Sequence, residues 1–238
     1  MPNQPDVSIS NVTKTFGQSK VLHSVDINLD RGDIYALIGP NGSGKTTLVK
    51  IMVGLLAFDS GSISLFGHDI QKEPEAAKRT FGYVSDGPVG YDFLSGSEFL
   101  ALAASLKGLT KKEAEAQIKE LAKLFPLTDV LPQSMTHYSR GNLQKVAFIA
   151  ALLNSPQILI IDEPVVGLDP GSITIFGEKI KKFADRGGLV FFVTHTLSFA
   201  QKYANRYGLL KAGVLVEQGK ITPHLNLESL YHKQVGYD

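Results

Sequence analysis

The sequence of 238 residues contains no cysteine, has almost no excess of charge of either sign, and has no long apolar run. Without cysteine, the chain can form neither disulfides nor thiolate metal sites. There are 24 lysine and arginine residues against 23 aspartate and glutamate residues, and the net charge of +1 gives no field that would attract nucleic acid. The longest apolar run, 146–153, is far shorter than the ~18 residues that a membrane span requires. We therefore expect no nucleic-acid partner and no membrane crossing by this chain.

The beginning of the chain and its overall composition point the same way. Residues 1–20 lack a basic start followed by an apolar stretch, so secretion is not expected. The absence of cysteine fits the cytosol. A hydrophobic content of 43% is enough for one core of normal size, and no internal repeat or low-complexity tract is evident. The sequence thus predicts a single unit, with room for an inserted lobe.

A glycine-rich segment at 39–46 is the strongest positive signal. It fits the pattern G-x-x-x-x-G-K-[ST], in which backbone N–H groups cradle phosphates, Lys45 reaches the β/γ oxygens and the Thr46 hydroxyl holds Mg²⁺. An apolar run at 33–38 precedes it and a helical pattern at 46–52 follows, which is the strand, loop and helix context that this motif needs. The predicted phosphate-binding residues are Gly39, Pro40, Asn41, Gly42, Ser43, Gly44, Lys45, Thr46 and Thr47.

Changes of hydrophobic period along the chain predict an α/β fold. Alternating residues and turn signals over 7–38 indicate a small antiparallel sheet, to which a β stretch at 61–67 is added. Between 95 and 131 the pattern is helical, with helices expected at 97–106 and 110–125. The second of these has Thr110 and Glu113 spaced as a capping box, and its apolar face is formed by Ala114, Ile118, Leu121 and Phe125.

Two continuous apolar runs, 158–161 and 189–193, predict strands of a parallel sheet that helices cover on both faces. Ligands bind beyond the carboxyl ends of such strands. Asp162 and Glu163 follow the first run. Alone, this pair could start a loop or cap a helix, but beside a phosphate loop Asp162 is expected to hold Mg²⁺ and Glu163 to act as general base on the attacking water. His195 follows the second run, and this place favours a functional over a structural histidine.

These motifs, in this order, resemble the nucleotide-binding subunit of an ATP-binding cassette (ABC) transporter, and the resemblance covers essentially the whole chain. Residues 139–142, which read Ser-Arg-Gly-Asn, are followed by Gln144 and Lys145 and resemble the family's signature Leu-Ser-Gly-Gly-Gln. The resemblance implies that this segment binds the γ-phosphate across a dimer interface. Read from the residues alone, it opens the helix expected at 142–153, as an anion site or as a simple helix cap.

The same resemblance assigns roles to single residues. It implies that Ser139 and the N–H of Gly141 are the contacts made across the dimer, while Arg140 and Asn142 depart from the signature. His195 is expected to bond the γ-phosphate and the catalytic acid. Segment 167–170, Gly-Leu-Asp-Pro, is similar to the family's D-loop and brings its Asp169 to the interface; otherwise it is an ordinary turn.

Two further positions are interpreted through the resemblance. Phe16 occupies the adenine-stacking position, for which a π face suffices, although it could also be a core residue of the small sheet. Asp86 stands where the family usually has a glutamine that senses Mg²⁺ and water and links the core to the helical lobe. Because aspartate is shorter than glutamine, Asp86 is expected to reach Mg²⁺ only through water, or to leave that role to other residues.

The expected fold is a P-loop NTPase with a RecA-like parallel sheet, an N-terminal antiparallel β subdomain and an inserted α-helical subdomain. Residues 1–86 and 139–238 would form the core and residues 87–138 the helical subdomain. The implied activity is Mg²⁺-dependent ATP hydrolysis by a homodimer or heterodimer, peripheral on the cytoplasmic face of the cell membrane, that drives transport through a separate transmembrane permease. The expected direction is export, because segments 91–92, 94–100 and 227–231 look similar to the ABC-2 exporter branch.

Three alternatives remain at this point. A soluble ABC ATPase of translation or DNA repair generally carries two cassettes, long coiled coils or zinc inserts, none of which is evident here. An unrelated P-loop kinase or GTPase would explain the phosphate loop but not the signature segment, Asp169 and His195 together. A regulatory cassette that hydrolyses ATP slowly is disfavoured because Glu163 and His195 are both present.

Overall fold

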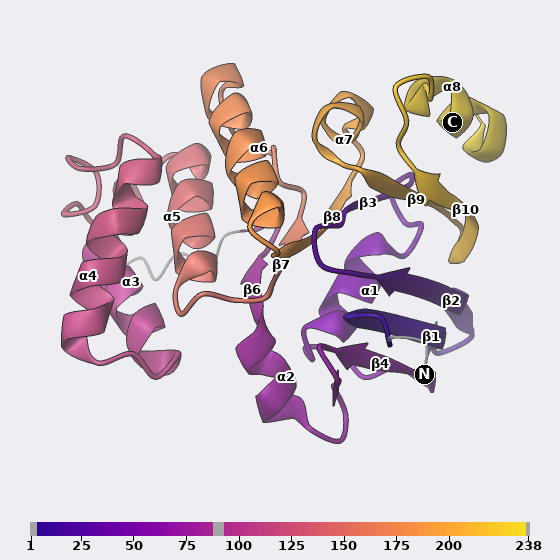
Figure 1. Ribbon diagram of the computed structural model, residues 1–238, viewed down its shortest axis with the longest axis horizontal. Helices are drawn as coiled ribbons and strands as arrows, with labels where there is room; N and C mark the ends of the chain where they lie inside the picture. Colours follow the sequence, from indigo (N-terminus) through magenta and orange to yellow (C-terminus); the bar gives the residue numbers. More distant parts are fainter. Residues whose placement is uncertain (1–3, 88–92, 237–238) are drawn as a thin grey trace.

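The small sheet is antiparallel and comes from the first third of the chain, in a computed structural model that describes residues 4–87 and 93–236. Its strand order is β2-β1-β4-β5, and it lies below the larger sheet (Figure 1). Apolar side chains of its three long strands face the same core, because every second residue of a strand points to one side. The strands are β1 (Val7–Phe16), β2 (Ser19–Leu29), β4 (Ser60–Leu65) and β5 (His68–Asp69).

The larger sheet has six strands in the order β10-β9-β3-β8-β7-β6. All neighbours are parallel except β10, which pairs antiparallel with β9 at the edge. Strands β3, β7 and β8 are buried along their whole length, as their apolar sequences predict. The strands are β3 (Ile34–Ile38), β6 (Phe81–Val84), β7 (Ile158–Asp162), β8 (Leu189–Thr194), β9 (Arg206–Lys211) and β10 (Val214–Lys220).

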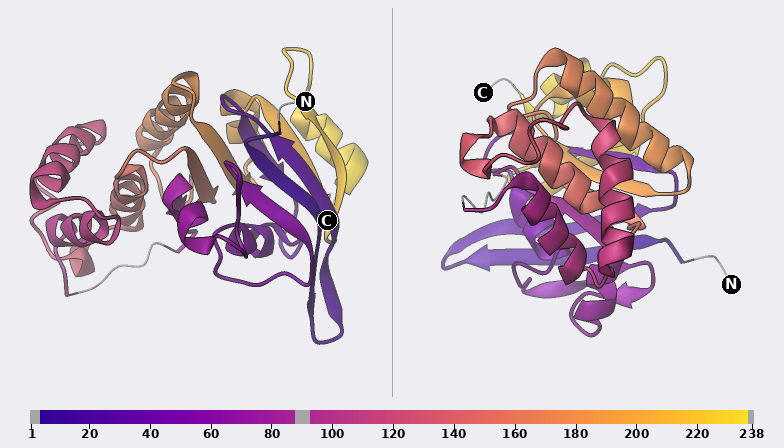
Figure 2. Two further views of the ribbon diagram at one scale, coloured as in Figure 1. Left: turned by 60° about the horizontal axis from the view of Figure 1, so that its bottom comes forward. Right: turned by 90° about the vertical axis from the view of Figure 1, so that its left-hand side faces the viewer.

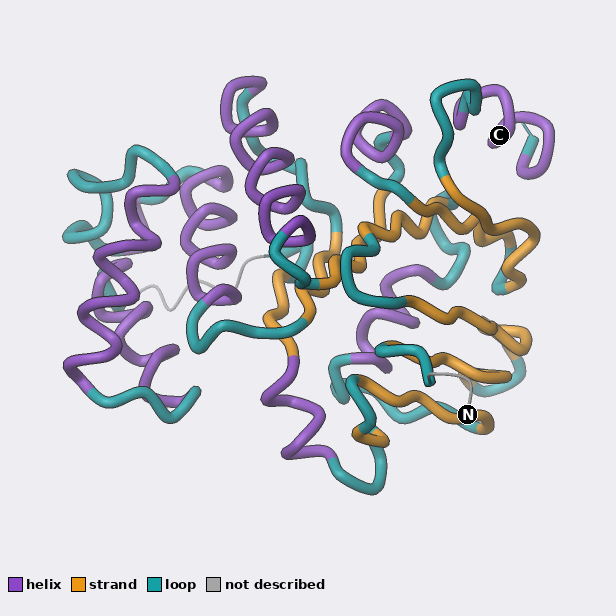
Figure 3. Tube along the Cα trace, in the orientation of Figure 1, coloured by secondary structure: helices purple, strands orange, loops and turns teal. Residues whose placement is uncertain are grey.

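Helices cover both faces of this sheet and extend beyond one edge of it (Figures 1 and 3). Helix α1 lies between the two sheets, α6 and α7 cover the opposite face, and α3 and α4 stand at the far end from the small sheet (Figure 2). The helices are α1 (Lys45–Met52), α2 (Pro74–Thr80), α3 (Gly96–Leu106), α4 (Lys111–Leu121), α5 (Arg140–Leu152), α6 (Pro170–Asp185), α7 (Leu197–Tyr203) and α8 (Leu227–Val235), with 3₁₀ turns η1 (Ala122–Leu124) and η2 (Met135–His137). The predicted α/β fold is confirmed.

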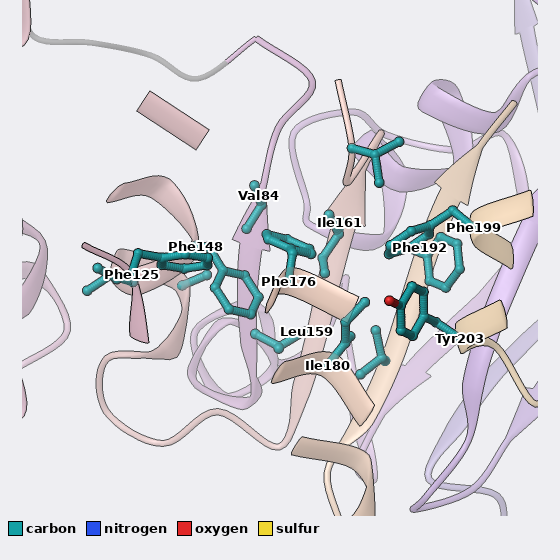
Figure 4. Close-up of a cluster of buried hydrophobic side chains, with 14 of the residues drawn as sticks. Val84, Phe125, Phe148, Leu159, Ile161, Phe176, Ile180, Phe192, Phe199 and Tyr203 are labelled. Atoms are coloured by element: carbon teal, nitrogen blue, oxygen red, sulfur yellow. The ribbon is translucent and has the colours of Figure 1, made fainter. Parts of the chain in front are cut away.

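The two faces of the larger sheet supply two hydrophobic clusters. Alternate residues of β7 go to opposite sides: Ile160 packs with α1 and the small sheet, and Ile161 packs with α6 and α7. The second cluster continues into the helical lobe through aromatic rings that meet edge to face or at a tilt (Figure 4). The ring of Phe148 in α5 lies 6.1 Å from that of Phe125 and 4.3 Å from that of Phe176, centre to centre. The helical lobe and the sheet therefore share one continuous core.

The helix predicted over 110–125 ends earlier in the structure, at Leu121. Thr110 and Glu113 form the predicted capping box, but α4 ends at Leu121 and a 3₁₀ turn follows it. Phe125 lies after both, with an extended backbone (φ −134°, ψ 154°). The reason is Pro126, because a proline disfavours the helical conformation of the residue before it. Strands β9 and β10 and helix α8 were not anticipated, and Tyr91 and Asp92 of the predicted exporter motif lie outside the described residues.

Candidate nucleotide site

The glycine-rich loop connects the end of β3 to the start of α1, as its sequence context predicts. Gly44 caps α1 with a left-handed backbone (φ 104°). A Cβ atom there would lie 2.8 Å from Leu22 Cδ2 and 2.9 Å from the Val21 carbonyl oxygen, so both conformation and space require glycine. Helix α1 begins directly at the end of the loop, and the unpaired backbone N–H groups of its first turn favour an anion there.

Lys45 is 7% exposed and folds back over this loop. Its Nζ donates to the carbonyl oxygen of Gly39 at 2.8 Å and to that of Pro40 at 2.9 Å. Burial lowers the pKa of Lys45, while the nearby carboxylates of Glu163 and Asp162 oppose that shift. The site thus holds a cation and two acids close together, from segments more than a hundred residues apart.

Asp162 ends β7 and is 1% exposed. Its Oδ1 accepts a hydrogen bond of 3.4 Å from Thr46 Oγ1, whereas its Oδ2 is buried without a hydrogen-bond partner. Burial raises the pKa of Asp162 to about 6, and the negative charges of Asp86 and Glu163 act in the same direction. The hydrogen bond from Thr46 and the positive charge of Lys45 oppose this shift. A hydroxyl beside an unsatisfied carboxylate oxygen fits Mg²⁺, which prefers oxygen ligands and keeps several waters. Over 4–87 and 93–236 no three His, Cys, Asp or Glu residues converge on a metal site, so nucleotide and water would supply the other ligands.

Asp162→Asn is expected to stabilise the nucleotide-free protein at pH 7 and to abolish Mg²⁺-dependent activity. The change from an ordinary pKa of 3.8 to about 6 means that ionised Asp162 destabilises the fold. At about 1.4 kcal/mol per pKa unit, the gain from a neutral amide is at most about 3 kcal/mol. This gain shrinks as the pH falls from 6 to 4, because the carboxyl group of the folded chain becomes protonated, and it is absent only well below the unfolded pKa of 3.8. Thermal unfolding at pH 7 and pH 4 measures it, and a lower Tm for the variant at pH 7 would contradict the prediction.

Glu163 follows Asp162 and lies beside His195. Its Oε1 is 2.9 Å from His195 Nδ1, and its Oε2 accepts a hydrogen bond of 3.1 Å from Thr194 Oγ1. Glu163 has φ 55°, a left-handed conformation that is rare for this residue type and is typical of functional sites. Its N–H donates to Val193 O at 3.0 Å, which keeps it beside the neighbouring strand β8. Thr194 was missed in the sequence, although its place just before His195 could have indicated it.

Phe16 lies at the end of β1 and is 48% exposed, so the alternative that it is a core residue is wrong. Its ring is available for stacking, with Lys14 Nζ 5.2 Å from the ring centre. Asp59 holds this strand end, because its carboxylate accepts the N–H of Thr15 at 2.6 Å and pairs with Lys14 at 3.3 Å.

The signature segment lies elsewhere on the molecule. Ser139 Oγ caps α5 by accepting the N–H of Asn142 at 3.2 Å. In the part of the chain that the structure describes, no hydrogen bond or ion pair joins Ser139 or Gly141 to the loop 39–46. Within the described residues, the two predicted halves of the phosphate site are thus not hydrogen-bonded to each other. Asp169, in turn, begins α6: its Oδ1 accepts the N–H of Ser172 at 2.8 Å, and its Oδ2 lies 3.7 Å from Lys145 Nζ. Asp169 is therefore the cap of helix α6 and not an ordinary turn residue.

Asp86 follows β6, beside the end of β7 that carries Asp162. Its Oδ1 accepts the N–H of Gly87 at 2.8 Å, and its carbonyl oxygen accepts a hydrogen bond of 3.1 Å from the guanidinium of Arg140. In the described ranges, Asp86 has no direct hydrogen bond to Thr46 or Asp162. Its influence on the pKa of Asp162 is through its charge.

Comparison with known proteins agrees with this geometry. The ABC transporter family model matches residues 22–166. The uncharacterized ABC transporter ATP-binding protein YdbJ of Bacillus subtilis is 33% identical over 94% of this chain and 70% of its own length. The lantibiotic transport ATP-binding protein SrtF of Streptococcus pyogenes is 31% identical over 98% of both chains.

Solved structures give the same result. An ATP-binding subunit of an ABC transporter superposes with a TM-score of 0.89 at 32% identity, covering 96% of this chain and 98% of the other. The dimeric bacterial ABC transporter cassette MJ0796 superposes with a TM-score of 0.84 at 25% identity, covering 91% and 99%. The chain belongs to the ABC transporter family and is an ATP-binding cassette with ATPase activity. Its described residues include no helix long and apolar enough to cross a membrane.

Proposed function

We propose that this protein is the Mg²⁺-ATPase of an exporter and works as a head-to-tail dimer on the cytoplasmic membrane face, bound to a separate permease. The observation that carries the proposal is the close grouping of Lys45, Asp162 and Glu163 at the carboxyl ends of the parallel strands. The likeness to the lantibiotic transport protein SrtF supports export. We keep 1–86 with 139–238 as the core and 87–138 as the helical subdomain.

In the proposed mechanism each group has one task. Lys45 binds the β/γ oxygens, Phe16 stacks on adenine, and Thr46 with Asp162 holds Mg²⁺, which when bound neutralises charge on the phosphate oxygens. Glu163 accepts a proton from the attacking water, and His195 orients Glu163 and contacts the γ-phosphate.

The other half of each site would come from the second protomer. Because no hydrogen bond in the described residues joins Ser139 or Gly141 to the phosphate loop of their own chain, Ser139 and Gly141 of the partner subunit are proposed to bind the γ-phosphate. Asp169 would lie at the same interface, and the dimeric MJ0796 cassette supports this arrangement. Asp86 is proposed to act on Mg²⁺ through water, since its side chain makes no direct bond to Thr46 or Asp162.

Phosphate release by the purified protein tests the proposed activity. We expect steady ATP hydrolysis that requires Mg²⁺, is stopped by chelation, and is accompanied by dimers in light scattering. A protein that binds ATP but hydrolyses none would be the regulatory cassette. Hydrolysis by a strict monomer would contradict the assignment of Ser139 and Gly141.

The permease is proposed to dock where the helical lobe meets the core. Two cavities, of about 600 and 380 Å³, share Lys78, Phe81 and Lys107 in their walls. Leu55 and Leu106, at the edges, are 67% and 80% exposed. We call this region the lobe cleft; its other lining residues include Glu75, Arg79, Tyr83 and Ala103.

The charge of the lobe cleft indicates what it binds. Three cationic side chains line it against one acid, Glu75, which pairs with Lys78 at 2.9 Å. Lys107 Nζ donates to the carbonyl oxygens of Ala151 and Leu153, each at 3.0 Å, and burial lowers its pKa to about 8. An apolar permease segment with acidic side chains at one end would complement this surface.

Leu55→Glu is expected to abolish permease-stimulated ATPase activity while the isolated protein keeps its ATP turnover. Loss of an apolar anchor removes about 1.5–3 kcal/mol, so docking should weaken by at least about tenfold. Co-purification and ATPase rates in reconstituted membranes measure this. Val214→Glu, at a residue of similar kind on β10 that is 42% exposed, is the matched control. If the permease stimulated the ATPase activity of both variants equally, the lobe cleft would not be the docking site.

A further inference from the structure

Arg140, the first residue of α5, touches two other segments that surround the nucleotide site. Its guanidinium donates to the carbonyl oxygen of Asp86 at 3.1 Å. Its aliphatic stem lies against Gly167, where a Cβ atom would come within 2.8 Å of Arg140 Cγ. Gly167 also has φ 80°, so a side chain is excluded by space and by backbone conformation. One side chain thus joins the signature segment, the segment after β6 and the D-loop.

The start of α5 is packed against the D-loop with little freedom. A Cβ atom on Gly141 would lie 2.8 Å from the carbonyl oxygen of Gly167. Strand β6 is likewise held to β7, with Val84 opposite Ile161, so Asp86 lies beyond the same edge as Asp162. The Arg140 side chain therefore connects the closely packed start of α5 to the segment that carries Asp86.

In the dimer that we propose, the joined segments serve different nucleotides. Ser139 and Gly141 contact the nucleotide bound by the other protomer, whereas Asp86 acts beside the nucleotide of its own chain. Arg140 is exposed, and in the proposed dimer it joins a segment of one site to a segment of the other.

We propose that Arg140 is a positioning residue that couples the two nucleotide sites of the dimer, so that ATP bound at one site adjusts Asp86 at the other. The inference rests on the proposed function. It requires that hydrolysis be cooperative in ATP, with a Hill coefficient above one and at most two, the number of sites.

The test compares Arg140→Met and Arg140→Lys in the full-length protein. Methionine keeps an apolar stem against Gly167 but removes every donor to Asp86, whereas lysine keeps the charge and an ammonium group that can donate. We expect Arg140→Met to bring the Hill coefficient to about one and to lower kcat, with ATP affinity measured by calorimetry unchanged. Arg140→Lys should restore part of the cooperativity.

A matched control comes from Arg31, which also joins distant segments: its guanidinium donates to Gln157 Oε1 at 2.7 Å and to the Gly187 carbonyl oxygen at 3.4 Å. Arg31→Met should lower the Tm without changing the Hill coefficient. Cooperativity of Arg140→Met equal to that of the wild type would overturn the inference, as would a wild type that hydrolyses ATP without cooperativity. An equal loss of Tm in both Arg140 variants, without rescue by lysine, would show a purely structural role. Absence of any hydrolysis by the wild type would instead refute the proposed function.

Discussion

Glu163→Gln is expected to lower ATP turnover by about 10²- to 10⁴-fold, the range for a positioned general base, with ATP affinity preserved. The amide cannot accept a proton from water, but it has nearly the same shape as the carboxylate. Its oxygen can still accept the hydrogen bond from Thr194 Oγ1, which is 3.1 Å from Glu163 Oε2. Closed dimers should then accumulate with Mg²⁺-ATP, because the step that reopens them is blocked.

Single-turnover phosphate release and light scattering measure both effects. Glu217→Gln is a suitable control, because Glu217 also accepts a hydrogen bond from a neighbouring hydroxyl, that of Tyr207 at 3.0 Å, but lies on β10. It should keep wild-type turnover. If light scattering found Glu163→Gln only as monomers under saturating Mg²⁺-ATP, the contacts of Ser139 and Gly141 across the dimer would lose their main support.

Lys45→Ala is expected to reduce ATP affinity by about 10²- to 10³-fold. Charge-assisted hydrogen bonds contribute about 1.5–3 kcal/mol each, and Lys45 is the only cation in the loop 39–47. In the nucleotide-free protein its Nζ bonds the carbonyl oxygens of Gly39 and Pro40, so alanine also leaves these two loop groups without their donor. The loop should consequently lose order as well as charge.

Calorimetric titration with Mg²⁺-ATP measures this loss. Lys50→Ala is the matched control, because Lys50 lies in the same helix α1 but is exposed to solvent. It should bind ATP as the wild type does. If Lys45→Ala kept wild-type affinity and turnover, the phosphate site would be wrongly assigned to this loop.

The elements that the sequence predicted well depend on short-range interactions. The capping box of Thr110 and Glu113 is formed within three residues, and the strand, loop and helix around 39–46 are adjacent in the chain. Even the wrong end of the helix over 110–125 has a local cause, since Pro126 directly follows Phe125. Strand β10 was missed because it pairs at a sheet edge and none of its side chains is buried: they alternate between exposed and half-buried.

By itself the sequence determined the fold class, the family and the identity of the phosphate loop, because residue types at fixed spacings carry this information. Only the tertiary structure decided which distant groups meet. Arg140 reaches Asp86, and Phe148 joins the helical lobe to the sheet through Phe176, whereas the contact of Glu163 with His195 was already expected from the family resemblance. These contacts depend on strand order and on packing between segments far apart in the chain. No local pattern encodes them, since each is made only after the sheet and the helices that cover it have assembled.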